Sequence, residues 1–199
     1  MIKKYTTILG ALILGLELVQ PGGASAGVPT DQIRVTVDRV LAILKDPALN
    51  TAGAREARRS ELTKAILPRF DFEEMAKRSL GAEWRRRSPA EQEEFIRLFT
   101  ELLKNSYVEA IESYRGDKVV YRRESLDGDY AEVGTTVINH QGEEFTIDYR
   151  LNLAGSEWKV YDVVTENISI VNNYRSQFSR ILGRSSFAEL LRTIRNKVN

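Results

Sequence analysis

Residues 145–153 read FTIDYRLNL, and this stretch decides the fold because its side chains alternate without interruption. The odd-numbered side chains are apolar, and the even-numbered ones are polar or charged. Successive side chains of a β-strand point to opposite faces of the sheet, so the pattern predicts a strand with one buried and one exposed face. The protein should therefore contain a sheet with an apolar wall.

Three further strands are predicted around this one. Residues 119–121 and 131–137 alternate in the same way on either side of an Asp-Gly turn at 127–128. After the strand, a Gly-Ser turn at 155–156 leads into the apolar stretch 158–164. Four consecutive strands joined by short turns predict an antiparallel meander.

Helical patterns precede and follow the predicted sheet. They cover residues 33–44, 55–67, 72–80, 89–116, 170–182 and 187–198. The strongest start signal is a capping box formed by Ser88 and Glu91, with Pro89 at the first helical position. Helices followed by strands and then helices predict an α+β domain, with the helices packed on one face of the four-stranded sheet.

The N-terminus has the features of a secretory signal peptide. Lys3 and Lys4 precede an apolar run at 8–16, and the small residues Ala-Ser-Ala follow at 24–26. The run is shorter than the roughly 20 residues that a membrane-spanning helix needs. We therefore expect residues 1–26 to be removed on export, which leaves 27–199 as a single domain.

Composition argues against several classes of protein. The chain has 29 basic and 28 acidic residues, whereas nucleic-acid-binding proteins usually carry a basic excess on one face. It has no cysteine, which excludes disulfides, thiolate metal sites and cysteine nucleophiles. The single histidine, His140, lies in a predicted turn and does not supply a typical zinc site. We expect no metal and no cofactor.

Candidate catalytic groups are few. The letters GASAG at 23–27 match a serine-hydrolase elbow but fall on the predicted cleavage site, not between a strand and a helix. Asp148 and Asp162 lie within apolar strands, where a carboxylate with a raised pKa can act as a base. The alternation instead favours an outward-facing Asp148, or one paired with Arg150. A basic run at 85–87 either contacts anionic surfaces or is a solvated helix end.

Several separated segments carry a resemblance to a known family. They are DFEEMAKRSLGAEW at 71–84, QEEF at 92–95, FTELL at 99–103, WKVYDV at 158–163 and NYRSQF at 173–178. In this order they resemble the MlaC family of soluble periplasmic lipid carriers, over residues 31–198. Asn167 stands where that family usually has a glycine in the turn after the last long strand, and asparagine also adopts the left-handed conformation.

The resemblance implies a function that the motifs alone do not. It implies a periplasmic, non-enzymatic carrier whose cargo is a phospholipid. Its partners are then an outer-membrane Mla lipoprotein complex and an inner-membrane Mla ABC transporter complex, and its role is to maintain outer-membrane lipid asymmetry. Exposing two acyl chains of some 15 carbons to water costs on the order of 20 kcal/mol, at about 0.8 kcal/mol per methylene. Such a carrier must hide the chains and leave the headgroup in water.

We expect N- and C-terminal helices to enclose an apolar pocket against the sheet. Its predicted lining is Phe99, Leu103, Tyr107, Val133, Phe145, Ile147, Tyr149, Leu151, Tyr174 and Phe178. Arg175 is expected near the mouth, where it pairs with a lipid phosphate or forms a structural salt bridge. Periodicity alone does not distinguish a hollow interior from a filled one.

Two alternatives remain open. A family member of this kind could carry another hydrophobic lipid, such as a hopanoid, which the same apolar wall accepts. The other alternative is a small enzyme that acts on an apolar substrate with Asp148 or Asp162 as its base. Identification of the bound lipid distinguishes the first alternative from a phospholipid carrier. Turnover that is lost in Asp→Asn variants would distinguish the second, the enzyme, from any carrier.

Overall fold

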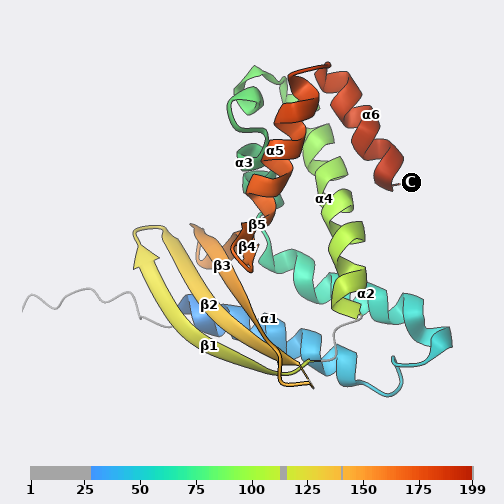
Figure 1. Cartoon of the computed structure of the whole chain (residues 1–199), viewed down its shortest axis with the longest axis vertical. Helices are drawn as coiled ribbons and strands as arrows, with labels where there is room; N and C mark the ends of the chain where they lie inside the picture. The colour runs from blue at the N-terminus through green and yellow to red at the C-terminus, as the bar shows by residue number, and fades with distance from the viewer. Residues whose placement is uncertain (1–27, 113–115, 140, 199) are drawn as a thin grey trace, which may run out of the picture.

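The structure is a computed structural model that describes residues 28–112, 116–139 and 141–198 (Figure 1). The predicted signal peptide, the GASAG motif and His140 lie outside these residues. Across the described ranges, no helix has both the length and the apolar character needed to span a membrane.

The sheet is an antiparallel meander, as the sequence predicts. Its strands are β1 (Gly116–Asp127), β2 (Tyr130–Asn139), β3 (Glu144–Ala154), β4 (Glu157–Thr165) and β5 (Ile168–Ser169), in that spatial order. The sheet has five strands instead of the predicted four, because two-residue β5 pairs with the end of β4. Glu166 and Asn167 connect β4 to β5 with φ values of 48° and 66°, so Asn167 adopts the left-handed conformation expected of it.

The two faces of the sheet differ in chemistry, as the alternation of β3 predicts. Val133 of β2 pairs with Tyr149, which pairs with Val163 of β4. The opposite face carries the charged side chains of Arg123, Glu132, Asp148 and Arg150, which form ion pairs with one another. Sequence periodicity therefore assigns both faces correctly.

A bulge in β4 changes the register next to the helices. Arg150 of β3 pairs with Asp162, but the next residue, Leu151, pairs with Val160. Tyr161 is thus an extra residue on β4, a local feature that increases strand twist and redirects side chains. Its ring lies 4.1 Å from the guanidinium carbon of Arg78, on a neighbouring helix.

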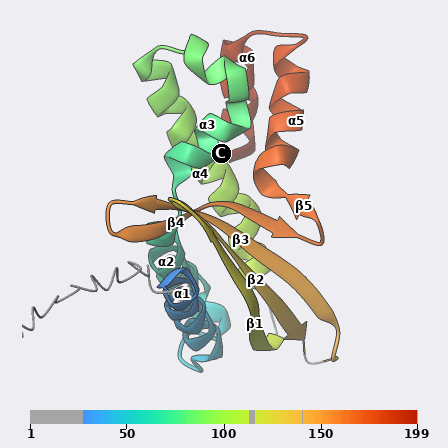
Figure 2. The same ribbon diagram turned by 90° about the vertical axis from the view of Figure 1, so that its left-hand side faces the viewer.

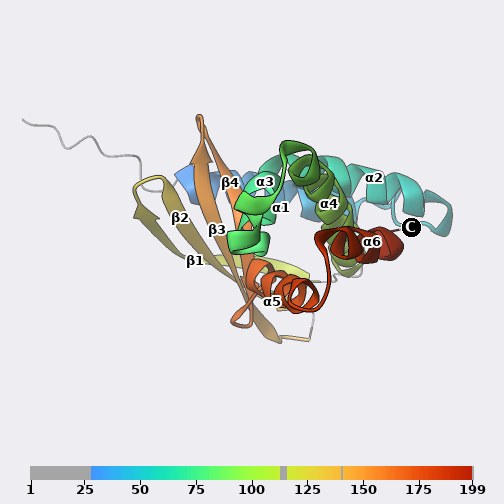
Figure 3. The same cartoon turned by 90° about the horizontal axis from the view of Figure 1, so that it is seen from above.

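The helices fall into two groups (Figures 1 and 2). They are α1 (Val28–Lys45), α2 (Arg55–Ile66), α3 (Phe72–Leu80), α4 (Pro89–Glu112), α5 (Ile170–Leu182) and α6 (Phe187–Val198), with short 3-10 helices at η1 (Ala52–Ala54), η2 (Leu67–Arg69) and η3 (Gly81–Arg86). Helix α1 lies along the apolar face of the sheet, whereas α3, α4, α5 and α6 form a bundle beyond its β4 edge (Figure 3).

Capping residues set the helix ends where the sequence predicts them. Glu91 accepts a hydrogen bond from the Ser88 backbone N–H at 2.8 Å, and Ser88 Oγ accepts one from the Glu91 N–H at 3.3 Å. Asp71 caps α3 by accepting from the Glu74 N–H, and Ser169 caps α5 by accepting from the Asn172 N–H. These bonds satisfy donors that a helix leaves unpaired at its N-terminus.

Each group of helices builds its own packed core. The sheet cluster is formed by Ile33 of α1 with Ala131, Val133, Leu151, Trp158 and Val160. The helical cluster joins α3, α4, α5 and α6, and at its centre the rings of Phe95, Phe99, Tyr174 and Phe178 lie 5.2–5.6 Å apart. The described residues therefore contain two cores.

Asp162 links the two cores. The residue is 3 % exposed, and its carboxylate accepts hydrogen bonds from Ser169 Oγ at 2.6 Å, from the Val171 backbone N–H at 3.1 Å and from Arg150 Nη1 at 3.2 Å. One carboxylate on β4 thus fixes the first turn of α5 and neutralises an arginine of β3. A second link lies nearby, where the Asp71 N–H donates to the Val160 carbonyl at 2.9 Å.

We expect Asp162→Ala to lower the free energy of unfolding by about 3 kcal/mol, since the substitution removes a buried carboxylate that binds Arg150, the Ser169 hydroxyl and the Val171 N–H. The matched control is Asp148→Ala, which breaks the more exposed pair with Arg123 and should cost less than about 1 kcal/mol. Urea unfolding followed by circular dichroism measures both values. Equal losses in the two variants would contradict the linking role of Asp162.

Candidate functional site

The predicted sheet wall is buried to different depths along its length. Val133 and Leu151 are fully buried in the sheet cluster. Tyr149 and Ile147 are only partly buried, and Phe145 is 40 % exposed. Apolar side chains on this face are therefore incompletely covered toward the start of β3.

The predicted helical lining lies mostly inside the helical cluster. Phe99, Leu103, Tyr174 and Phe178 are buried there, and Tyr107 packs against the cluster while remaining partly exposed. Phe99 and Tyr174 meet edge to face, with ring centroids 5.2 Å apart. The structure thus brings the helical residues together with one another, and it places the sheet residues in a separate group.

A third set of apolar residues is buried but belongs to neither cluster. We call it the junction group: Leu62 and Ala65 of α2, Val108 of α4 and Val137 of β2. Helices α2 and α4 contact each other at the end of the molecule where Figure 1 shows the C-terminal half of α4 approaching α2. The α2 members of this group were not predicted as lining residues, because α2 is highly charged and has few apolar residues.

Two tyrosine hydroxyls lie at the edge of the helical cluster. Tyr174 Oη is 3.5 Å from Ser106 Oγ. Burial raises the pKa of Tyr107 to about 12, with smaller contributions in the same direction from the nearby Tyr174 hydroxyl and Asp162 carboxylate. Burial likewise raises the pKa of Tyr121, beside α1, to about 12, with Asp38 adding to the effect. The hydroxyls of these tyrosines are thus neutral at ordinary pH.

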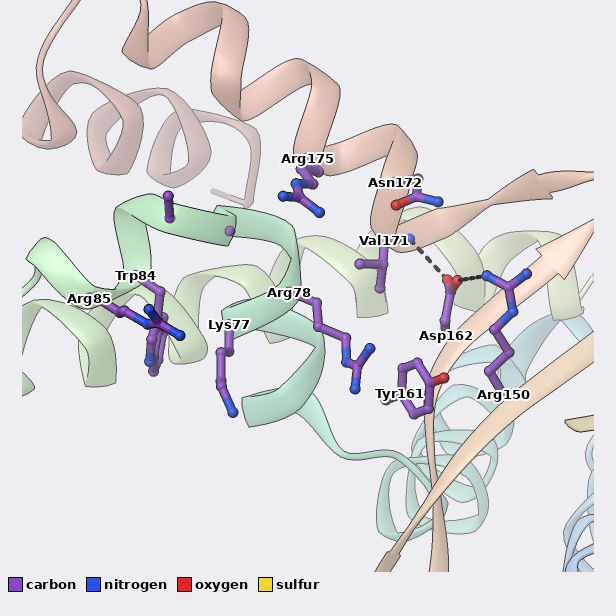
Figure 4. Close-up of a pocket in the computed structure, with 12 residues that line it drawn as sticks. Lys77, Arg78, Trp84, Arg85, Arg150, Tyr161, Asp162, Val171, Asn172 and Arg175 are labelled. Atoms are coloured by element: carbon purple, nitrogen blue, oxygen red, sulfur yellow. Dashed lines mark hydrogen bonds and ion pairs between the residues drawn. The ribbon is translucent and has the colours of Figure 1, made fainter. Parts of the chain in front are cut away.

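A pocket of about 560 Å³ opens between α3, η3, α5 and the strands β3 and β4 (Figure 4). We call it the basic pocket, and its lining is Lys77, Arg78, Gly81, Ala82, Trp84, Arg85, Arg150, Tyr161, Asp162, Val171, Asn172 and Arg175. Arg175, predicted near the mouth of a lipid pocket, lies here and not beside the predicted sheet wall. This pocket could not be predicted from local sequence patterns, since its lining comes from segments far apart in the chain.

Most polar groups around the basic pocket are engaged. Arg150 is bound to Asp162, and Glu74 accepts from Lys77 Nζ at 3.1 Å and from Arg78 Nε at 2.8 Å. Both oxygens of Asp162 are occupied by protein donors. The carboxylate that sequence analysis considered as a base therefore has a structural role.

Asp148, the other candidate base, lies on the charged face of the sheet and pairs with Arg123 at 3.1 Å. This position agrees with the outward-facing alternative. Within the described ranges, no group of three or more histidine, cysteine, aspartate or glutamate side chains is arranged to hold a metal ion.

These features define an α+β domain with an incompletely covered apolar sheet face and a basic pocket on another side. The family model for MlaC protein matches residues 34–196, and the chain belongs to the MlaC family.

Three relatives are informative. The intermembrane phospholipid transport system binding protein MlaC of Haemophilus influenzae is 23 % identical over 96 % of this chain and 91 % of its own. The toluene tolerance protein ttg2D of Pseudomonas putida is 26 % identical over 81 % of this chain and 76 % of its own. A phospholipid-binding protein from Ralstonia solanacearum, solved in complex with a phospholipid, superposes with a TM-score of 0.75 at 28 % identity, over 85 % of this chain and 96 % of its own.

Alkaline pH should destabilise the protein through its buried tyrosines. The folded state keeps the Tyr107 proton up to about pH 12, whereas the unfolded chain loses it near the ordinary tyrosine pKa of 10.0, so stability falls as pH rises from about 10 to 12. Tyr107→Phe should flatten this fall, and the double variant with Tyr121→Phe should flatten it further. Urea midpoints at pH 8, 10 and 11 test the expectation, which an unchanged slope in both variants would contradict.

Proposed function

We propose that this protein is a periplasmic phospholipid carrier of the Mla system. It shuttles lipid between the outer-membrane Mla lipoprotein complex and the inner-membrane Mla ABC transporter complex, and so maintains the lipid asymmetry of the outer membrane. The observation that carries the proposal is the likeness to the Ralstonia protein, which is bound to a phospholipid and matches over 85 % of this chain. The name of the Haemophilus relative supports the same system.

The acyl chains are proposed to lie between the two cores. The sheet supplies one wall, with Val133 and Leu151 at its buried base and Tyr149, Ile147 and Phe145 along its less covered part. The junction group supplies buried apolar surface from α2, α4 and β2. An acyl chain that lies against them gains dispersion contacts with apolar side chains.

The helical residues of the predicted lining form the opposite, rigid wall in this proposal. Phe99, Leu103 and Phe178 are buried in the helical cluster and fixed by mutual ring and aliphatic contacts, so they give this wall a backing that keeps its shape when a lipid enters or leaves. Tyr107 and Tyr174 border this wall with neutral hydroxyls, which do not impose a charge on an acyl chain. A carrier of this design needs no catalytic residue.

Native mass spectrometry tests the proposal directly. The mature protein, purified without detergent from a bacterial periplasm, should carry a phospholipid adduct, because removing the chains into water costs on the order of 20 kcal/mol. Extraction of the same sample identifies the lipid class. A bare mass from well-folded protein would contradict the proposal, and a hopanoid adduct would replace the cargo while keeping the carrier.

A bulky side chain in the junction group should displace the lipid. Val108→Trp is expected to fold and to lower lipid occupancy several-fold, since the indole takes the place of acyl carbons. The same substitution at Val160, within the packed sheet cluster, should cost about 1–3 kcal/mol of stability through overpacking. Lipid per folded protein and the thermal midpoint are the two measurements.

The matched control is Val35→Trp, because Val35 is 67 % exposed and lies on α1 away from either cluster. It should leave both lipid occupancy and stability unchanged. Should Val108→Trp destabilise the protein as much as Val160→Trp while the folded fraction keeps its lipid, the space beside Val108 is filled by protein and the chains lie elsewhere.

A further inference from the structure

The basic pocket carries more positive charge than the neighbouring carboxylates neutralise. Its lining contains five cationic side chains and the single carboxylate of Asp162, which already binds Arg150. Glu74, just outside, is shared by Lys77 and Arg78. Two guanidinium groups in the lining, those of Arg85 and Arg175, form no hydrogen bond or ion pair with any residue that the structure describes.

Gly81 leaves room for the Arg175 guanidinium. Gly81, which ends α3 with a φ of 59°, lies against this group, and a Cβ at that position would come within 2.9 Å of Nη2 and 3.1 Å of Nε. The positive φ favours glycine at this position. The Arg175 side chain thus lies over the start of η3, where it remains exposed.

Figure 4 shows how the charged groups are arranged around the pocket. Arg175 comes from α5, Arg85 from η3 and Arg78 from α3, so three separate elements present guanidinium groups to one opening. The first turn of α5 is already closed, because Asp162 and Ser169 accept from the N–H groups of Val171 and Asn172. A ligand at this site is thus bound by side chains and not by the end of the helix.

The pocket also has an apolar side. Val171 belongs to the helical cluster, and Trp84 and Tyr161 pack against that cluster from the pocket lining. With a volume of about 560 Å³, the pocket has room for a phosphate and for an organic group attached to it. Basic side chains beside an aromatic surface suit an ester more than a bare ion.

We propose that the basic pocket is an oxyanion site, which binds the phosphate of a phosphate ester through Arg85 and Arg175. Planar guanidinium groups bind phosphate oxygens through two parallel charge-assisted hydrogen bonds, and these are stronger than bonds between neutral groups. The phosphate comes from a phospholipid headgroup or from a soluble ester. Binding of a phospholipid headgroup rests on the proposed function, whereas binding of a soluble phosphate ester does not.

Titration of the purified mature protein with inorganic phosphate and with sn-glycerol 3-phosphate, at constant ionic strength, tests the soluble source. Calorimetry should show saturable binding that Arg85→Gln/Arg175→Gln weakens by about tenfold or more, as expected when charge-assisted hydrogen bonds are lost. The matched control is Arg97→Gln/Arg180→Gln, which removes the same charge from exposed positions outside the pocket and should bind as the wild type does.

The lipid carried by the same variants tests the headgroup source. If the pocket binds a lipid headgroup, the Arg85→Gln/Arg175→Gln variant should retain less phospholipid than the Arg97→Gln/Arg180→Gln control after equal washing, even where soluble esters do not bind. If the double variant fails to fold, the single Arg85→Gln variant serves instead, since Arg85 is exposed and without a partner among the described residues.

The outcomes separate this inference from the proposed function. Lipid retained equally by both variants, with no saturable binding of either soluble anion, overturns the oxyanion site and leaves the carrier intact. Absence of lipid from every variant overturns the carrier, while binding of glycerol phosphate that depends on Arg85 and Arg175 still supports the site.

Discussion

The buried carboxylate of Asp162 is the interaction on which the arrangement of this protein depends. The sheet cluster and the helical cluster are each packed internally, so neither core by itself fixes where the other lies. The Asp162 carboxylate ties the helical cluster to the sheet, because its oxygens bind the start of α5, the Ser169 hydroxyl and Arg150 of the neighbouring strand. A hydrophobic residue of similar size would fill the volume but would leave the Val171 N–H and the Ser169 hydroxyl without their acceptor, and Arg150 with Glu132 as its ion-pair partner.

Two cores joined at one edge give the protein two kinds of surface between them. On one side lie the junction group and the apolar face of the sheet, which is incompletely covered toward the start of β3. On the other side, the same β4 strand that carries Asp162 borders the basic pocket. The bulge at Tyr161 is what allows one strand to serve both, since the extra residue turns its ring toward Arg78 while Val160 stays in the sheet cluster.

Local sequence patterns predicted the elements well, because each pattern records a constraint within a few residues. The alternation at 145–153, the Ser88 and Glu91 capping box and the left-handed Asn167 all depend on neighbours in the chain. The site was harder to predict. Periodicity shows that Phe99 and Leu151 face an interior, but it does not show that they face different cores. The basic pocket was not predicted for the same reason, since Arg85 and Arg175 line one pocket only in the folded chain.

Apolar burial and charge have different consequences for a carrier. Burial of acyl chains supplies a large free energy that is nearly independent of the headgroup, because it depends on the hydrocarbon area removed from water. A phosphate held by Arg85 and Arg175 in a pocket that water also enters contributes far less, and salt weakens it. The proposed contact of the arginines with a headgroup phosphate therefore discriminates among lipids by charge and adds a small share to the total affinity. Its removal lowers lipid retention modestly, because the acyl chains supply most of the free energy of binding.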